Sequence, residues 1–177
     1  SAATQISRFR RILESEWAVR LPDYAALHDF SINQPDNFWR SFWKYAEVIG
    51  DWDGEVVLEH RDSIVDARWF PDAKLNFAEN LLRRNDDHDA LIFRSEAGER
   101  RTITFANLRR AVGQMQTVLR GFGVKPGDVV AGYLPNIPEA VIAMLGAASL
   151  GVVWTAVGDT FAVHILFASS GVFPDFI

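Results

Sequence analysis

Residues 140–158 contain no charged side chain, and this constrains the fold more than any other feature of the chain. A stretch of this length could form a membrane helix, because about 20 apolar residues span a bilayer. However, Gly146 and Gly151 interrupt it, alanine is frequent in its first part, and β-branched residues are frequent after Gly151. A helix followed by a strand that is buried on both faces accounts for the same composition. We therefore predict no membrane segment, and an α/β fold around this stretch.

The residues before this stretch alternate between strand and helix patterns. Thr104 is suited to cap a helix that begins at Phe105, and Pro138 fits the first turn of the next helix. The predicted elements are strands at 90–93 and 101–104, a helix at 105–121, a strand at 129–134, a helix from 138 to 150 and a strand at 152–157. The inner face of helix 105–121 should consist of Leu108, Val112, Met115, Val118, Leu119 and Phe122. Strand, helix and strand with short connections predict a parallel sheet with helices against its faces.

The first 85 residues predict a mostly helical segment. Apolar residues at three- and four-residue steps indicate a helix at 5–18, and Pro22 separates it from a short helix at 24–29. A third helix should begin near Pro35 and end at Gly50. Its bulky stripe consists of Phe38, Trp39, Phe42, Trp43 and Ala46. Aromatic side chains at helical spacing can stack on bases or cofactors, but more often they hold a helix to a core. We predict this structural role.

The boundary between the two parts of the chain is predicted at a polar turn, residues 85–89. Before it we expect a short strand at 56–60 and a helix at 75–84. One side of that helix should carry Leu75, Ala78, Leu81 and Leu82. We therefore divide the chain into an N-terminal cap segment, residues 1–85, and the beginning of a larger α/β domain, residues 86–177.

Charge and cysteine content exclude several kinds of site. Residues 105–177 hold four cationic and four anionic side chains, so the net charge of −5 lies entirely in residues 1–104. This acidic part disfavours nucleic-acid binding, which requires clustered cations. We interpret the local cluster Arg8, Arg10 and Arg11 as the solvated face of a helix. Cysteine is absent, which excludes disulfides and thiolate sites and is consistent with a cytoplasmic protein.

No motif for independent catalysis occurs in the chain. Its four histidines are far apart and have no metal-ligand spacing, and Ser169 and Ser170 lack the context of a hydrolase nucleophile. Residues 121–128 contain glycines and Lys125, as phosphate loops do. They follow a helix and precede a strand, which is the reverse of the order in such loops, and so predict a helix cap and turn. We therefore name no catalytic, cofactor-binding or metal-binding residue.

Four segments carry a family resemblance. Residues 67–82 read ARWFPDAKLNFAENLL, residues 119–136 read LRGFGVKPGDVVAGYLPN, and residues 138–151 and 31–39 continue the pattern. Together they resemble the adenylate-forming acyl-CoA synthetases, and within them the acetyl-CoA and acetoacetyl-CoA synthetase group. The sequence of residues 67–82 is most similar to that of the acetoacetyl-CoA synthetases. The chain is therefore identified as an N-terminal portion of such an enzyme, and residues 31–39 as part of its cap segment.

The resemblance implies a two-step ligase reaction in the parent enzyme. A carboxylate such as acetoacetate attacks the α-phosphate of ATP with the help of Mg²⁺, and the thiol of CoA then displaces AMP. In the family these steps use a Ser/Thr/Gly-rich loop ending in Pro-Lys, a Thr-Glu motif, a ribose-binding Asp and a C-terminal Lys. None of these motifs occurs in the 177 residues, so we expect the chain alone to bind none of these cofactors and to be inactive.

Two alternatives stay open at this point. The acyl substrate could instead be acetate or propionate, because the acyl pocket of such enzymes lies beyond Ile177. The chain could also be a non-catalytic interaction module that self-associates through apolar surfaces. Residues 155–177 depart from the family pattern, since the expected Pro-Asp-Phe-Gly element and the charged helix after it are absent.

Overall fold

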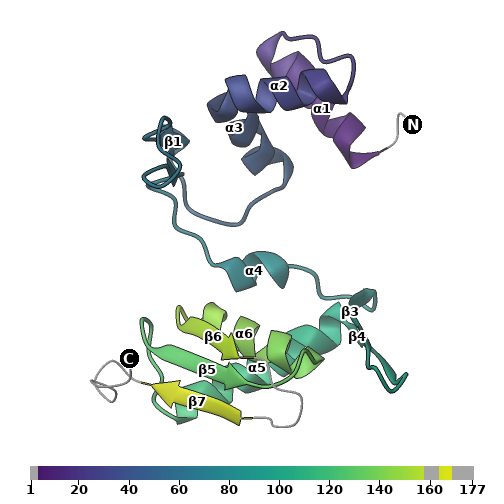
Figure 1. Ribbon diagram of the computed structural model, residues 1–177, viewed down its shortest axis with the longest axis vertical. Helices are drawn as coiled ribbons and strands as arrows, with labels where there is room; N and C mark the ends of the chain where they lie inside the picture. Colours follow the sequence, from purple (N-terminus) through teal and green to yellow (C-terminus); the bar gives the residue numbers. More distant parts are fainter. Residues whose placement is uncertain (1–3, 158–163, 169–177) are drawn as a thin grey trace. The chain divides into compact units, whose positions relative to one another are not determined.

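The structure is a computed structural model that describes residues 4–157 and 164–168. The chain forms two compact units, Ser1–Leu75 (unit 1) and Asn76–Ile177 (unit 2). Figure 1 shows helices and the short strand β1 in unit 1, and helices with longer strands in unit 2, which confirms the predicted α/β class. The predicted division after residue 85 concerns family domains rather than compact units, and it stays a prediction.

Three helices form most of unit 1: α1 (Gln5–Trp17), α2 (Tyr24–Asn33) and α3 (Pro35–Tyr45). Side-chain oxygens of Thr4 and Asp23 accept hydrogen bonds from the first turns of α1 and α2, which satisfies amides that have no partner within the helix. The helix predicted at 5–18 is confirmed. Helix α2 runs four residues beyond the predicted end at Asp29 and stops only before Gln34 and Pro35.

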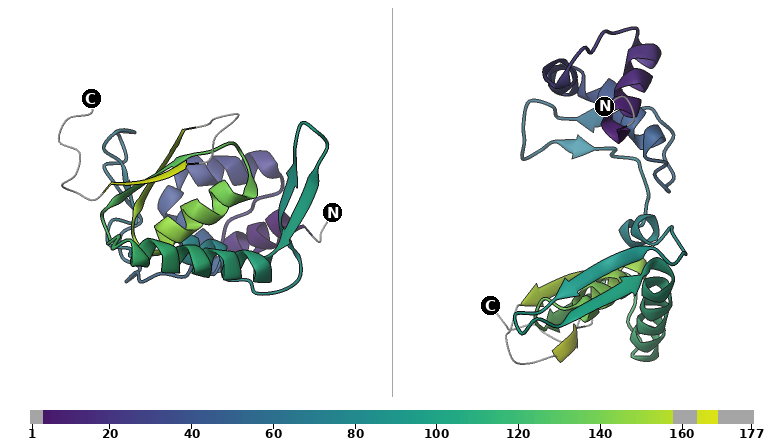
Figure 2. Two further views of the ribbon diagram at one scale, coloured as in Figure 1. Left: turned by 90° about the horizontal axis from the view of Figure 1, so that it is seen from below. Right: turned by 90° about the vertical axis from the view of Figure 1, so that its right-hand side faces the viewer.

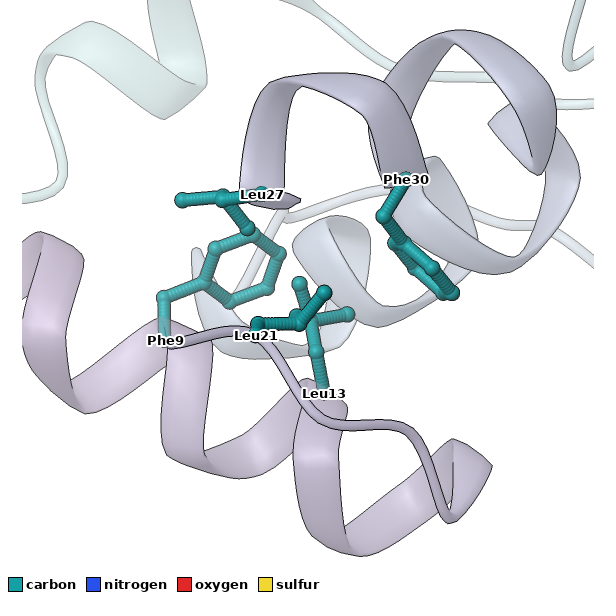
Figure 3. Packing of buried hydrophobic residues seen from close by; sticks show 5 residues of the cluster. All are labelled: Phe9, Leu13, Leu21, Leu27 and Phe30. Atoms are coloured by element: carbon teal, nitrogen blue, oxygen red, sulfur yellow. The ribbon is translucent and has the colours of Figure 1, made fainter. Parts of the chain in front are cut away.

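The core of unit 1 is a cluster of five side chains. Figure 3 shows Phe9, Leu13, Leu21, Leu27 and Phe30 pointing toward one another, and each is at most 6% exposed. Burial of each such side chain contributes about 1.5–3 kcal/mol. This cluster therefore packs α1 and α2 against each other in the core of unit 1.

The aromatic stripe of α3 packs in two directions. Phe38 contacts Phe9 of α1 edge-on, with ring centroids 5.4 Å apart. Trp43 lies 5.2 Å from Trp52 and 4.9 Å from Phe70 between ring centroids. The stripe thus ties α3 both to α1 and to the segment that follows it. These packing contacts support the structural role predicted for the stripe.

Helix α3 ends at Tyr45, so the predicted end at Gly50 is wrong. Glu47 adopts a left-handed backbone conformation with φ 51°, and the amide of Val48 donates to the carbonyl of Trp43. This is the hydrogen-bond pattern of a helix end in which glycine usually takes the left-handed position. Because Glu47 adopts that conformation, the helix stops before the glycine is reached.

Short strands and a short helix follow. Strand β1 (Leu58–Glu59) pairs with β2 (Arg68–Trp69) in antiparallel fashion, so the strand predicted at 56–60 is shorter than expected. Helix α4 (Phe77–Leu81) replaces the longer helix predicted at 75–84. The side chain of Asn76 accepts a hydrogen bond from the amide of Glu79 and caps the helix. The helix therefore begins two residues later than predicted. Ala78 is buried and Leu81 is about half exposed, whereas Leu75 lies before the helix, so its predicted place on the apolar side of this helix is wrong.

Unit 2 contains the predicted hairpin and its helix. Strands β3 (Asp89–Arg94) and β4 (Arg100–Thr104) pair antiparallel, with Leu91 opposite Ile103. Thr104 then caps α5 (Phe105–Gly121) by accepting a hydrogen bond from the amide of Asn107, 3.2 Å away. The left view of Figure 2 shows the hairpin projecting beside α5.

A second sheet has the order β6-β5-β7. Strand β5 (Val129–Tyr133) is parallel to β6 (Val153–Val157), and α6 (Pro138–Ser149) connects them, which confirms the predicted strand-helix-strand unit. Strand β7 (His164–Ala168) pairs with the other edge of β5 in antiparallel fashion, a pairing that was not predicted.

Helices α5 and α6 cover one face of this sheet. Leu119 of α5, Val130 of β5 and Ala147 of α6 are buried in one cluster. Val118 and Phe122 are 48% and 67% exposed, so their predicted place on the inner face of α5 is wrong. Val118 lies about 100° around the helix from Leu119, and Phe122 lies just beyond the last helical residue.

Candidate functional site

The turn between α5 and β5 is the part of the chain that most resembles a phosphate loop. The backbone amides of Gly123, Val124, Gly127 and Asp128 all donate to backbone carbonyls. The amide of Lys125 donates to the Asp128 carboxylate at 2.8 Å. Amides that already have partners within the protein cannot point at a phosphate. The predicted helix cap and turn is therefore confirmed.

The polar turn at residues 85–89 holds one organised carboxylate. Asp86 accepts hydrogen bonds from the Nε of Arg84 at 2.9 Å and from the amide of His88 at 3.0 Å. The hydrogen bond from Arg84 lowers the pKa of Asp86, and the His88 amide adds to this effect, while partial burial opposes it. Asp86 is thus held ionised within its own turn.

The histidines considered from the sequence form no metal site within the described residues. In the described parts of the chain, no three histidine, cysteine, aspartate or glutamate side chains could hold a metal ion together. Ser169 and Ser170 lie outside the described residues. Residues 4–157 and 164–168 include no helix with the length and hydropathy that a membrane span requires.

The clearest charged contact of unit 2 joins the hairpin to α6. Arg101 of β4 donates two parallel hydrogen bonds to Glu139, at 2.8 and 2.9 Å. Its guanidinium also lies 5.1 Å from the ring centroid of Phe93. The hydrogen bond from Arg101 lowers the pKa of Glu139, although partial burial opposes this effect. The paired geometry is typical of a structural contact, and here it positions the first turn of α6.

A groove of about 630 Å³ lies between α1 and α3 in unit 1. Lys44 donates to Glu16 at 2.8 Å, the hydroxyl of Ser41 also donates to Glu16, and the indole of Trp17 donates to Ser41 at 2.8 Å. Burial raises the pKa of Glu16, but the hydrogen bonds from Lys44 and Ser41 outweigh it, so the pKa is lowered. The groove therefore contains an ionised carboxylate that is held in place.

This groove was missed in the sequence because its two sides lie far apart in the chain. Glu16 and Lys44 are 28 residues apart, and neither belongs to a recognised motif. Arg8 and Arg11, which also line the groove, were interpreted as a solvated helix face. Only the packing of α1 against α3 brings these groups together.

Models of two protein families match successive parts of the chain. A model of the AMP-binding enzyme family matches residues 77–166, which is just over half of the chain. The chain belongs to the AMP-binding enzyme family. A model of the acetyl-coenzyme A synthetase N-terminus matches residues 24–81.

Individual relatives of this member of the AMP-binding family are acyl-CoA synthetases. Acetoacetyl-coenzyme A synthetase of Rhizobium meliloti is 44% identical over 78% of the chain and 21% of the relative. Malonamoyl-CoA synthetase of Penicillium aethiopicum is 37% identical over 91% of the chain and 23% of the relative. The solved acetoacetyl-CoA synthetase from Streptomyces lividans is 39% identical, with a TM-score of 0.77 over 89% of the chain and 25% of that structure. The chain spans about a quarter of the length of these relatives and is a homologue of acetoacetyl-CoA synthetases.

Proposed function

We propose that this chain is the N-terminal part of an acetoacetyl-CoA synthetase-like ligase. The parent enzyme would convert ATP, acetoacetate and CoA into acetoacetyl-CoA, AMP and pyrophosphate. The observation that carries the proposal is the likeness to the Streptomyces lividans enzyme, which extends over 89% of the chain in both fold and sequence. Residues 1–85 would be the cap segment and residues 86–177 the beginning of the adenylate-forming domain. The parent would work in the cytoplasm.

Within this enzyme the chain would act as a scaffold. The hairpin, α5 and the β5-α6-β6 unit share buried clusters, which gives unit 2 a core that further strands could extend. A rigid sheet of this kind can support active-site loops contributed by other parts of the enzyme. The chain would therefore contribute to the reaction by holding these active-site loops in position.

Two features of the described residues support the proposal that the cofactors of the parent reaction bind elsewhere. The amides of the turn between α5 and β5 all have partners within the protein, so the turn offers nothing for a triphosphate. A Mg²⁺ site needs several oxygen ligands, and the described parts contain no suitable acidic cluster. We propose that ATP, Mg²⁺ and CoA bind to residues outside this chain, and that the chain alone is inactive.

The gene downstream of the Ile177 codon provides the first test. A Ser/Thr/Gly-rich loop ending in Pro-Lys, in any reading frame, would support a ligase, and the complete gene product should then release AMP when acetoacetate, ATP and CoA are supplied. The 177-residue chain, assayed in parallel, should release none. AMP release by the chain alone, or no AMP release by a complete product that contains the loop, would contradict the proposal.

The name of the Penicillium aethiopicum relative favours a second candidate substrate, a malonamoyl group. Competition assays on the complete product, with acetoacetate, malonamate, acetate and propionate, separate these possibilities through their kcat/KM values. We expect acetoacetate to give the highest value. A higher value for any other acid would assign the enzyme to that substrate.

The other alternative is a non-catalytic module that self-associates. The observation in its favour is a row of exposed apolar side chains on the sheet of unit 2, with Val129 and Tyr133 just over a third exposed and Val153 about half exposed. Light scattering after size-exclusion chromatography would detect such an association. A monomer at micromolar concentration would exclude this candidate.

A further inference from the structure

The loop between β1 and β2 carries the two most exposed large apolar side chains of the described residues. Ile64 is 97% exposed and Val65 is 88% exposed, whereas the next value is 69%, at Tyr24. Single exposed apolar side chains are ordinary on a protein surface. Two adjacent ones on one loop form an apolar projection, which we call the tip. Exposed apolar surface with polar groups at its edge can mark an interaction site.

Hydrogen bonds hold the loop that presents the tip. The amide of Ser63 donates to the carbonyl of His60 at 3.1 Å, and the amide of Ala67 donates to the carbonyl of Ser63 at 2.8 Å. The hydroxyl of Ser63 donates to the carboxylate of Asp66 at 2.6 Å. A loop that is ordered before it binds loses less conformational entropy on binding. The tip is therefore presented in a form that is ready to dock.

Two carboxylates lie beside the tip in a hollow of about 480 Å³. The lining of the hollow is polar and consists of His60, Asp62, Ser63 and Asp66. Among the described residues neither Asp62 nor Asp66 has a cationic partner, and the nearby Arg61 already pairs with Asp36 of α3. Carboxylates of this kind suit the head group of an arginine or a lysine. The loop thus offers an apolar projection with an acidic hollow next to it.

We propose that the tip docks into an apolar pocket of the parent enzyme, formed by residues that follow Ile177, and that a cationic side chain beside this pocket enters the acidic hollow. The inference rests on the proposed function, because it requires such a parent. The chain covers 21% of the Rhizobium meliloti relative and 25% of the Streptomyces lividans structure. About three quarters of such an enzyme is therefore available to cover the tip.

The small size of the tip favours a surface of the same polypeptide over a separate molecule. Stable complexes between separate proteins bury at least about 1,200 Å², which is far more than two side chains supply. A surface in the same polypeptide acts at high effective concentration, so a small contact can form there. A membrane is disfavoured, because even a myristoyl chain binds a bilayer only marginally. Residues 59–68 also carry three carboxylates and two cations, which anionic lipids would not attract.

Thiol labelling measures whether the tip is covered. The 177-residue chain contains no cysteine, so Ile64→Cys introduces its single thiol. A maleimide should label the folded chain within about twofold of the rate of the urea-unfolded chain. In the complete gene product, position 64 should react at least about tenfold more slowly than in the urea-unfolded product, because the thiol reacts only when the contact opens. Mass spectrometry of the peptide around residue 64 identifies the labelled site, and the protection should not change on dilution.

Two further variants test the chemistry of the contact. Ile64→Asp/Val65→Asp should lower the midpoint of thermal unfolding of the complete product by at least about 2 °C, because it places carboxylates in an apolar pocket. The same variant should change the midpoint of the 177-residue chain by less than about 1 °C. Ile64→Leu/Val65→Leu, which stays apolar, is the matched control and should change neither midpoint by more than about 1 °C. Asp62→Asn should speed labelling at position 64 of the complete product at least about twofold.

Several results would overturn the proposal. These are rapid labelling of the folded complete product, equal shifts of the chain and the product in the aspartate variant, an unchanged labelling rate in Asp62→Asn, and a stop codon directly after Ile177. Protection that disappears on dilution would also overturn it and assign the tip to a second copy of the protein. AMP release is a separate measurement. A product that protects position 64 but releases no AMP keeps the docking and contradicts the ligase, and a product that releases AMP with an exposed tip does the reverse.

Discussion

At the scale of single residues, the burial of Leu13 makes a prediction about the stability of unit 1 possible. It is fully buried in the cluster of Figure 3, whereas its neighbour Ile12 is 40% exposed. Replacing Leu13 with alanine should lower the free energy of unfolding of unit 1 by about 2–5 kcal/mol, because the cavity cannot close completely. Ile12→Ala should lower it by less than about 1 kcal/mol. Urea denaturation followed by tryptophan fluorescence measures both values, and equal losses would contradict the assigned core.

The ion pair of Arg101 and Glu139 should make the stability of unit 2 depend on pH. Glu139 has a lowered pKa in the folded state, so its stabilisation is present above the ordinary value of 4.5 and is lost as the pH falls through the folded pKa. About half of the Glu139 side chain is exposed to solvent, which screens the ion pair, so its contribution to stability should be small. A carboxyl NMR titration should give a midpoint below 4.5 for Glu139, and Arg101→Gln should raise it. Arg100→Gln should not, and a similar rise in both variants would exclude a specific pair.

At the scale of elements, two helix glycines should respond to alanine with opposite signs. A methyl group at Gly146 of α6 would meet the Cγ and Cβ of Met115 in α5 at 2.5 and 3.0 Å, whereas at Gly113 it meets nothing within 4 Å. Gly146→Ala should destabilise unit 2 by about 1–2 kcal/mol, because overpacking between the helices exceeds the gain in helix propensity. Gly113→Ala should stabilise it by up to about 1 kcal/mol. Thermal unfolding followed by circular dichroism compares them, and a stable Gly146→Ala variant would refute close packing of α5 on α6.

Elements with local signals at their ends could be predicted from the sequence. Helix α5 has a threonine cap, α6 has a proline in its first turn, and β3 and β4 flank a glycine turn, so their positions were correct within a few residues. Where the end of an element depends on an unusual conformation or on a tertiary contact, prediction was wrong. Glu47 ends α3 in a left-handed conformation, and Asn76, which also donates to the carbonyl of Ala148, delays α4.

At the scale of the whole molecule, family membership could be predicted and the groove of unit 1 could not. The runs 67–82 and 119–151 carry the family signal as local strings of residues, and both lie within the segments matched by the family models. The groove depends on Glu16 and Lys44, which meet only when α1 packs on α3. Contacts of this kind leave no pattern in one sequence, because each residue alone is typical of a solvated helix surface.

The two units should unfold independently, because each has a buried cluster of its own. Five of the six tryptophans lie in Ser1–Leu75, so their fluorescence reports mainly on unit 1. Amide exchange in α5 reports on unit 2. Leu13→Ala should shift only the fluorescence transition, and Gly146→Ala should change only the exchange of α5. The double variant should be additive within about 0.5 kcal/mol. If either substitution changes the tryptophan fluorescence transition and the amide exchange of α5 equally, the two cores unfold as one cooperative unit. The prediction of independent unfolding is then wrong.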